Sequence, residues 1–181
     1  MSREILRQTD ANSCLACCLL FIAGEITGQR FSGDDERRLA IESFGLCRES
    51  FALSYLLAFK KQFPELGVTI IVDNELYRDY LEALTCGKIR TEAKPITMDL
   101  IAKETASGPL ILFVDRYFFD YELHIPHYVV VESQNGNFSV NDPWQGESIV
   151  RTQLQLQEAI FGVKYILEWA PTVVKIDRLS A

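Results

Sequence analysis

The spacing of hydrophobic and polar positions divides the chain into a helical first half and a β-rich second half. From about Ser13 to Gly24 nearly every position is apolar, which predicts a helix buried on all sides. Four later stretches mix charged and apolar residues at helical spacing, and they predict helices over Asp34 to Phe44, Ser50 to Phe63, Asn74 to Leu84 and Thr97 to Ala106. The β-branched run Val68 to Val72 predicts a strand, and residues 88–96 fit neither pattern.

From Leu110 onward the apolar runs become short and β-branched. Asn135-Gly136 is a strong hairpin signal, and Asn141 to Gly146 has the composition of a turn. The pattern predicts a helix over Thr152 to Ile160 and strands over Leu110 to Val114, Tyr128 to Val131, Phe138 to Asn141, Ser148 to Val150, Val163 to Trp169 and Val173 to Ile176. We therefore expect one α+β domain over residues 1–181, with a helical half of about 1–108 and an antiparallel β half of about 109–181.

Composition narrows the possible partners. The chain has 181 residues, a length that suits one domain with a full core. Its formal net charge is -7 and no run is rich in lysine or arginine, which argues against a nucleic-acid surface and against anionic membranes. The apolar run from Leu15 to Ala23 is too short to span a bilayer.

The five cysteines do not form a disulfide framework, because their number is odd and three of them cluster at 14, 17 and 18. This usage favours a reducing compartment, so we expect a cytoplasmic protein. A redox C-x-x-C pair and half of a zinc site are alternatives for Cys14 and Cys17. A redox pair should follow a strand, and the segment before Cys14 is polar. A zinc site needs a second pair of ligands, and the sequence has no second paired motif.

Cys14 is a candidate nucleophile. It falls in the first turn of the buried helix, directly after Asn12 and Ser13, whose side chains we expect to accept hydrogen bonds from the free N–H groups there. The partial positive charge of a helix N-terminus stabilises a thiolate, the reactive form of cysteine. The alternative for Cys14 is an inert buried thiol. For Cys17 and Cys18, which follow at helical spacing, we expect a packing role behind the site.

Two histidines limit the choice of a catalytic base. His127 immediately precedes an apolar strand, and Asp142 ends the strand that returns from the hairpin, so the two should meet at one end of the sheet. His124 is the competing base, but it lies in a loop that fixes its position less well. Gln8 lies six residues before Cys14, close enough for its amide N–H and the backbone N–H of Cys14 to bind an oxyanion.

This constellation resembles the papain-like cysteine peptidases: Gln8 and Cys14 at the start of a buried helix, then His127 before YVVV, then Asp142 in Asn-Asp-Pro. Within that group it is most similar to the bacteriocin-processing (double-glycine leader) peptidase type. The resemblance implies a papain-like α+β fold in which the nucleophile helix packs on the C-terminal sheet. It also implies Cys14 as nucleophile, His127 as general base and acid, Asp142 as the residue that orients it, and Gln8 as oxyanion donor.

We therefore expect a thiol hydrolase that cleaves peptides or protein tails and needs no metal or organic cofactor. A deamidase, an acyltransferase of transglutaminase-like type and a non-catalytic peptide-binding module are the alternatives. Leu15 stands where the resembled type usually has glycine, a difference expected to reshape the cleft. The aromatic segment Tyr117 to Tyr121 either lines a substrate groove or packs on the sheet, and Trp144 either shields the His–Asp pair or anchors the turn.

Overall fold

A computed structural model describes residues 5–119 and 121–179. This part of the chain contains six α-helices, one short 3₁₀-helix and seven strands. The helices are α1 (Cys14–Thr27), α2 (Gly33–Ser43), α3 (Phe51–Gln62), α4 (Glu75–Thr85), α5 (Met98–Thr105), η1 (Arg116–Phe119) and α6 (Gln153–Tyr165). The strands are β1 (Leu66–Val72), β2 (Arg90–Ala93), β3 (Leu110–Asp115), β4 (Pro126–Gln134), β5 (Asn137–Asp142), β6 (Glu147–Arg151) and β7 (Thr172–Arg178).

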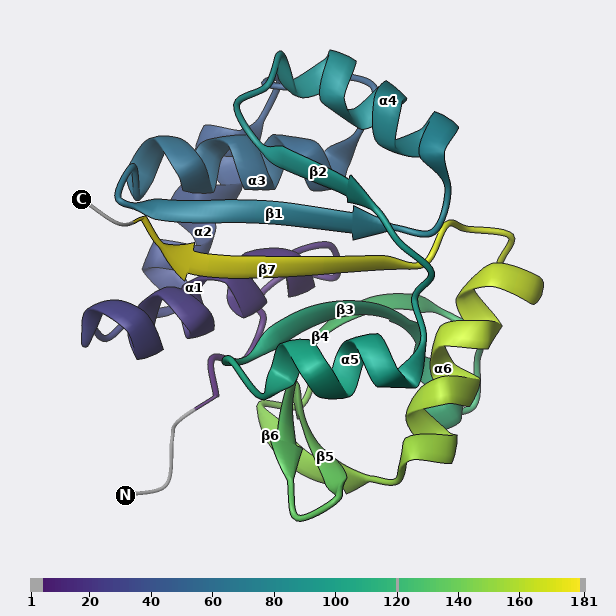
Figure 1. Ribbon diagram of the computed structural model, residues 1–181. Coiled ribbons are helices and arrows are strands. Elements are labelled where there is room, and N and C mark those ends of the chain that lie inside the picture. Colours follow the sequence, from purple (N-terminus) through teal and green to yellow (C-terminus); the bar gives the residue numbers. More distant parts are fainter. Residues whose placement is uncertain (1–4, 120, 180–181) are drawn as a thin grey trace.

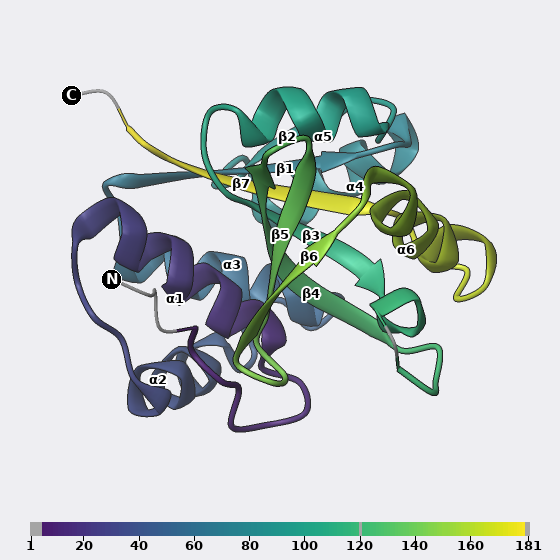
Figure 2. The same cartoon turned by 90° about the horizontal axis from the view of Figure 1, so that it is seen from below.

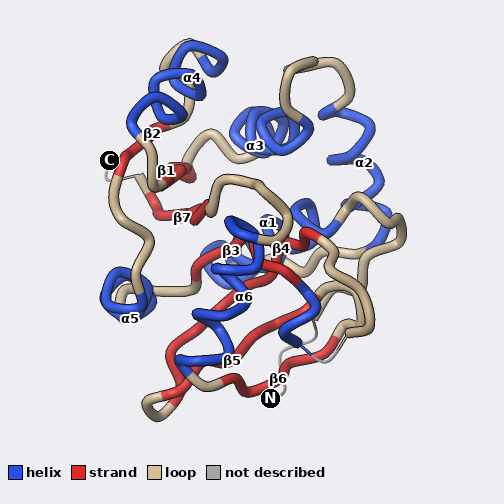
Figure 3. Tube along the Cα trace, turned by 90° about the vertical axis from the view of Figure 1, so that its right-hand side faces the viewer, coloured by secondary structure: helices blue, strands red, loops and turns tan. Residues whose placement is uncertain are grey.

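All seven described strands form one sheet in the order β2-β1-β7-β3-β4-β5-β6 (Figure 1). The β1–β2 pair is parallel, and the other neighbours are antiparallel. Strand β7, which comes last in the sequence, lies between β1 and β3 and so joins the strands of the first half to those of the second. Figure 3 shows β1 and β2 at one end of the molecule and β5 and β6 at the other.

Helices cover both faces of the sheet because its central strands are apolar on both sides. On one face α1, α2 and α3 form a core with Ile70 of β1, Val130 of β4 and Val174 of β7. On the other face α5 and α6 pack on the alternate residues, among them Val129 and Val173. Figure 2 shows the sheet between α5 on one side and α1, α2 and α3 on the other.

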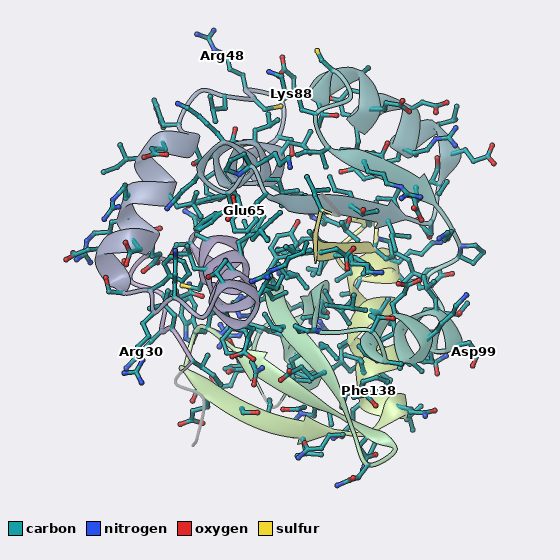
Figure 4. All side chains as sticks on the ribbon, turned by 60° about the vertical axis from the view of Figure 1, so that its left-hand side comes forward. Arg30, Arg48, Glu65, Lys88, Asp99 and Phe138 are labelled. Carbon is teal, nitrogen blue, oxygen red and sulfur yellow. The ribbon has the colours of Figure 1, made fainter. Side chains whose placement is uncertain are left out.

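Most charged side chains lie on the outside of these layers. Arg30, Arg48 and Lys88 are exposed and project from the helical side of the molecule in Figure 4. Helix α1, by contrast, buries nine residues, from Cys14 to Ala23 with the exception of Phe21. The prediction of a central helix buried on nearly all sides is confirmed, and α1 also runs on to Thr27, where Gly28 ends it in the left-handed conformation.

The helix boundaries follow capping residues. The side chains of Ser50, Asn74, Thr97 and Thr152 each accept a hydrogen bond from an N–H in the first turn of α3, α4, α5 and α6. The hairpin predicted at Asn135-Gly136 is also present, with both residues at positive φ.

The prediction of a strand over Val163 to Trp169 is wrong. Helix α6 continues to Tyr165, because Leu156, Ala159, Ile160 and Val163 repeat at helical spacing and all face the core. The remainder of the predicted strand is a loop that leads to β7. Strand β2, in the segment that fitted neither pattern, pairs with β1 through residues Thr69 to Val72.

A close contact between α6 and β3 yields a stability prediction at Gly162. A β-carbon there would lie 2.6 Å from Asp115 Oδ2 and 2.7 Å from the Phe118 ring. Asp115 is fully buried and cannot move aside at low cost. We expect Gly162→Ala to lower the free energy of unfolding by about 1–2 kcal/mol, since overpacking costs more than the gain in helix propensity. Urea unfolding measures it, with Glu158→Ala on the exposed face of α6 as control; equal stability of the two variants would contradict the expectation.

Candidate active site

Three chain segments meet at the edge of the helical layer and the sheet. Cys14 is the first residue of α1, His127 is the second residue of β4, and Asp142 is the last residue of β5. Each therefore lies at the end of a regular element, where the backbone is fixed on one side and opens into a loop on the other. All three are buried, with exposed fractions of 9%, 3% and 1%.

The imidazole of His127 and the carboxylate of Asp142 form a buried pair, as the hairpin argument predicts. The distance from His127 Nε2 to Asp142 Oδ1 is 2.7 Å. The pair follows from the β4–β5 register, in which Val130 lies opposite Asn141 and the two strands continue toward His127 and Asp142. Because Nε2 is engaged by the carboxylate, Nδ1 is the ring nitrogen left for a second partner.

That second partner is the Cys14 thiol. Burial alone would lower the pKa of His127, but hydrogen bonds to Asp142 and Cys14, together with their negative charges, outweigh burial and raise that pKa above its ordinary 6.5. The pKa of Asp142 is lowered: burial would raise it, and the His127 bond and charge, the Tyr121 hydroxyl and the Trp144 N–H outweigh burial. The two shifts together favour a protonated His127 beside an ionised Asp142.

The N-terminus of α1 has no side-chain cap, so the expectation of a capping bond from Ser13 is wrong. Ser13 occupies the N-cap position, yet its hydroxyl donates to the Asp10 carbonyl (2.8 Å) and accepts from the Asp10 N–H (3.2 Å). Asp10 in turn accepts the Asn12 N–H through its side chain. The polar residues before α1 therefore bond to one another, and the N–H groups of the first turn are left to other partners.

Gln8 lies beside both halves of the site. Its backbone N–H donates to the Pro143 carbonyl (2.8 Å), which ties it to the turn that follows Asp142. Its side-chain Nε2 donates to the Asp10 carbonyl (2.8 Å), while Oε1 is buried without a hydrogen-bond partner. One of the two Nε2–H bonds is therefore engaged, and the other is the donor that the oxyanion role would require.

Glu36 is a site residue that the sequence reasoning missed. It is fully buried in α2, and its two carboxylate oxygens accept the Thr9 N–H at 2.9 and 3.1 Å. Thr9 follows Gln8, so this bond fixes the segment that leads to Cys14. No feature of the sequence indicates that Glu36 is buried. It follows Asp34 and Asp35 in an acidic first turn, and such residues are normally exposed.

His124, the competing base, has a different partner. Its Nδ1 lies 2.6 Å from Asp115 Oδ2, and its ring stacks on Tyr117 at a centroid distance of 4.1 Å. It belongs to the loop that connects η1 to β4 and has no contact with Cys14 among those described. The structure thus brings His127 to the thiol and holds His124 elsewhere.

The aromatic segment packs against the second core, and the role of lining a substrate groove stays a prediction. Phe119 is buried against the second core, as the packing alternative predicts. The hydroxyl of Tyr121 donates a hydrogen bond to Asp142 Oδ2 at 2.6 Å. Asp120, which lies between Phe119 and Tyr121 in the sequence, is outside the described residues. Trp144 is 40% exposed; its backbone N–H donates to Asp142 Oδ1 at 2.8 Å and its ring lies 4.5 Å from the Arg116 guanidinium.

Cys17 and Cys18 lie behind the nucleophile position. Burial is the main cause that raises the pKa of both thiols, which keeps them protonated and unreactive. Cys18 Sγ donates to the Tyr128 carbonyl at 3.4 Å, so α1 is bonded directly to β4. Among the described residues, no three His, Cys, Asp or Glu side chains gather in a group that could hold a metal ion.

Leu15 does not face the site. Its side chain is 1% exposed and belongs to the core that α1 shares with α2 and α3. The exchange of glycine for leucine after Cys14 is therefore absorbed by core packing, and the expectation that it reshapes the cleft is not supported.

Two surface hollows of about 300 and 610 Å³ lie away from this site. They flank the Asp73–Lys164 ion pair, and α4, α5 and α6 supply most of their walls. Cys14, His127 and Asp142 line neither of them. The candidate site is thus defined by converging chemical groups and not by the volume of a hollow.

A buried helix with a cysteine at its N-terminus, packed on a largely antiparallel sheet that carries a His–Asp pair, is the arrangement of a papain-like α+β fold. Among solved structures, the chain is similar to a double glycine motif protease from an AMS/PCAT transporter, solved in complex with the leader peptide. The TM-score is 0.51 at 14% identity, over 97% of this chain and 91% of that one. The resemblance in fold is thereby confirmed. No protein-family model matches the sequence, and the curated proteins give no match.

Proposed function

We propose that this protein is a cysteine peptidase that uses Cys14, His127, Asp142 and Gln8. The observation that carries the proposal is the buried imidazole of His127, bonded to Asp142 at 2.7 Å and interacting with Cys14, the first residue of α1. A nucleophile, a base and a group that orients the base are the three parts that covalent acyl transfer requires. An inert core thiol has no need of the other two.

In the proposed reaction, His127 Nδ1 takes the proton of the Cys14 thiol, and the thiolate attacks the scissile carbonyl carbon. The imidazolium then gives this proton to the leaving amine as the C–N bond breaks, which leaves an acyl group on Cys14. Water, deprotonated by His127, attacks the thioester and releases the carboxylic acid and the thiol. Asp142 holds the ring with Nδ1 toward the thiol and stabilises each imidazolium.

The tetrahedral intermediate needs hydrogen-bond donors for its oxyanion. The backbone N–H of Cys14 and the second Nε2–H of Gln8 are the donors we assign, since the first turn of α1 has no side-chain cap and the Gln8 backbone is bonded to Pro143. The Glu36–Thr9 bonds fix the segment between these two donors.

The raised pKa of His127 sets the upper pH limit of the proposed activity. Its imidazolium persists above pH 6.5 and is lost as the pH rises through the folded-state value, at which point the thiolate loses its counter-ion and the leaving amine its acid. We therefore assign the alkaline fall in activity to His127.

The substrate we propose is a peptide or protein tail with two glycines before the scissile bond. The double glycine motif protease that shares this fold was solved with its leader peptide, and the likeness covers nearly all of both chains. Described residues contain no helix long and apolar enough to cross a membrane, and all five cysteines are free thiols. The free cysteines suit a reducing compartment, and for this reason we propose a cytoplasmic location.

Competitive alkylation tests the nucleophile. Iodoacetamide at pH 6.5 to 7 should label Cys14 at least about ten-fold faster than Cys86, because a thiolate reacts and a free thiol is largely protonated there. Cys86 is an internal control that favours the opposite result, since it is exposed whereas Cys14 is buried. Mass spectrometry of tryptic peptides reads both rates in one sample.

Product analysis separates the peptidase from its alternatives. Peptides with Gly-Gly before the scissile bond should yield two fragments, whereas a deamidase would change glutamine to glutamate without cleavage and an acyltransferase would join the acyl part to an added amine. A peptide-binding module would do none of these. If Cys14 is labelled no faster than Cys86 and no peptide is cleaved, the proposal fails.

A further inference from the structure

Asp142 accepts more hydrogen bonds than a His–Asp pair requires. Oδ1 accepts both the His127 Nε2–H (2.7 Å) and the Trp144 N–H (2.8 Å), and Oδ2 accepts the Tyr121 hydroxyl (2.6 Å). Trp144 belongs to the turn directly after Asp142. Tyr121 comes from a separate segment between β3 and β4 and bonds to the carboxylate oxygen that His127 does not use.

The ring of Tyr121 is itself fixed. The Arg116 guanidinium lies 3.4 Å from the centroid of Tyr121 and 4.5 Å from that of Trp144, so one buried cation contacts both rings that flank Asp142. Arg116 follows the last residue of β3, and its N–H donates to the Ile125 carbonyl at 3.0 Å just before β4 begins. The segment therefore leaves and rejoins the sheet between two neighbouring strands.

We propose that Tyr121 is a positioning residue of the peptidase, held by Arg116, that sets both the orientation of Asp142 and the share of its negative charge available to His127. This inference rests on the proposed function. Rotation of the carboxylate about Cβ–Cγ would break the Tyr121 bond and at least one bond to Oδ1. A phenol donor also withdraws charge from the carboxylate, so less charge is left to stabilise the imidazolium.

Tyr121 remains a donor throughout the working pH range. Burial first, and then the bond to Asp142, raise its pKa, and Arg116 opposes these effects only in part. The charged and titratable groups that face the His–Asp pair come from three elements. Cys14 and Cys18 belong to α1, and Arg116 and Tyr121 belong to the segment after β3; Asp142, the partner of His127 within the pair, is the group on β5.

Tyr121→Phe tests the proposal because it keeps the ring against Arg116 and removes only the hydroxyl. Without this donor, Asp142 concentrates its charge on His127, so the alkaline limb of kcat/KM should move up by about half a pH unit. Freer rotation of the carboxylate should lower kcat about five- to twenty-fold, as expected for the loss of a hydrogen bond to a charged group. KM should not change, because Tyr121 is not assigned to the substrate.

Three further measurements decide between positioning and mere packing. Tyr80→Phe removes a half-exposed hydroxyl on α4 and should leave the profile unchanged. In an Asp142→Asn background, Tyr121→Phe should cost less than two-fold, since its effect acts through Asp142. Arg116→Lys keeps the positive charge but loses the planar stacking on Tyr121. It should move the alkaline limb of kcat/KM upward, by less than Tyr121→Phe does.

The inference is overturned if neither Tyr121→Phe nor Arg116→Lys moves the alkaline limb, whether or not the thermal midpoint falls. It is also overturned if Tyr121→Phe has its full effect in the Asp142→Asn background. Absence of cleavage by the wild-type protein would instead contradict the proposed function, and the pH profile of Cys14 alkylation would still report whether Tyr121 acts on the His–Asp pair.

Discussion

Replacement of Cys14 by alanine is expected to lower kcat/KM for peptide cleavage by at least about 10⁴-fold, because no acyl intermediate can form without the sulfur. Cys14→Ser should lose nearly as much, since a hydroxyl is a far weaker acid than a thiol and His127 cannot readily take its proton. Neither change should unfold the protein, because the side chain lies at the first position of α1 and both replacements are smaller.

The measurement is steady-state cleavage of a fluorogenic Gly-Gly peptide, with circular dichroism to confirm folding. Cys86→Ser, which removes an exposed thiol at the end of α4, is the matched control and should retain full activity. Peptide cleavage by Cys14→Ala within about tenfold of wild type would remove the assignment of the nucleophile.

Replacement of Asp142 by asparagine is expected to lower kcat/KM by about 10²- to 10⁴-fold. An amide removes the negative charge and can turn its NH₂ toward His127 Nε2, which favours the tautomer that points a proton at the thiol. Burial lowers the pKa of His127 and would no longer be offset by Asp142. The imidazolium should then be lost at a lower pH, so the alkaline limb should move down, the reverse of the shift expected for Tyr121→Phe.

Cleavage rates across the pH range test this, with Asp99→Asn on the exposed side of α5 as control. The opposite signs of the two shifts are informative, since general damage to the fold would not produce them. An unmoved alkaline limb in Asp142→Asn would show that the carboxylate does not govern the base.

The features that the sequence predicted correctly are local ones. Asn135-Gly136 defines a hairpin by its own backbone preference, and the hairpin by itself brings His127 to Asp142. The caps at Ser50, Asn74, Thr97 and Thr152 likewise act within one turn. The approach of Cys14 to His127 is a contact between distant segments, and only the resemblance to a family suggested it.

What the sequence could not predict depends on tertiary packing. Val163 begins a stretch that suggests a strand from its residue types. Helix α6 extends into this stretch because it packs on β3 and η1, which precede it by several tens of residues in the sequence. Glu36 reads as a solvated residue until α2 packs beside Thr9. Tyr121 is one of several aromatic residues in its segment, and the sequence does not show which of them contacts Asp142. The hydrogen bond to the Asp142 carboxylate identifies Tyr121 only in the structure.

The central place of β7 in the sheet has a consequence for biosynthesis. Leu66 of β1 pairs with Arg178 of β7, and β7 also pairs with β3, so among the described strands β7 alone joins the two halves of the sheet, and it comes last of them in the sequence. Contacts so distant in sequence form slowly. The sheet that supports His127 is therefore completed only after β7 has been synthesised, long after the segment that carries Cys14.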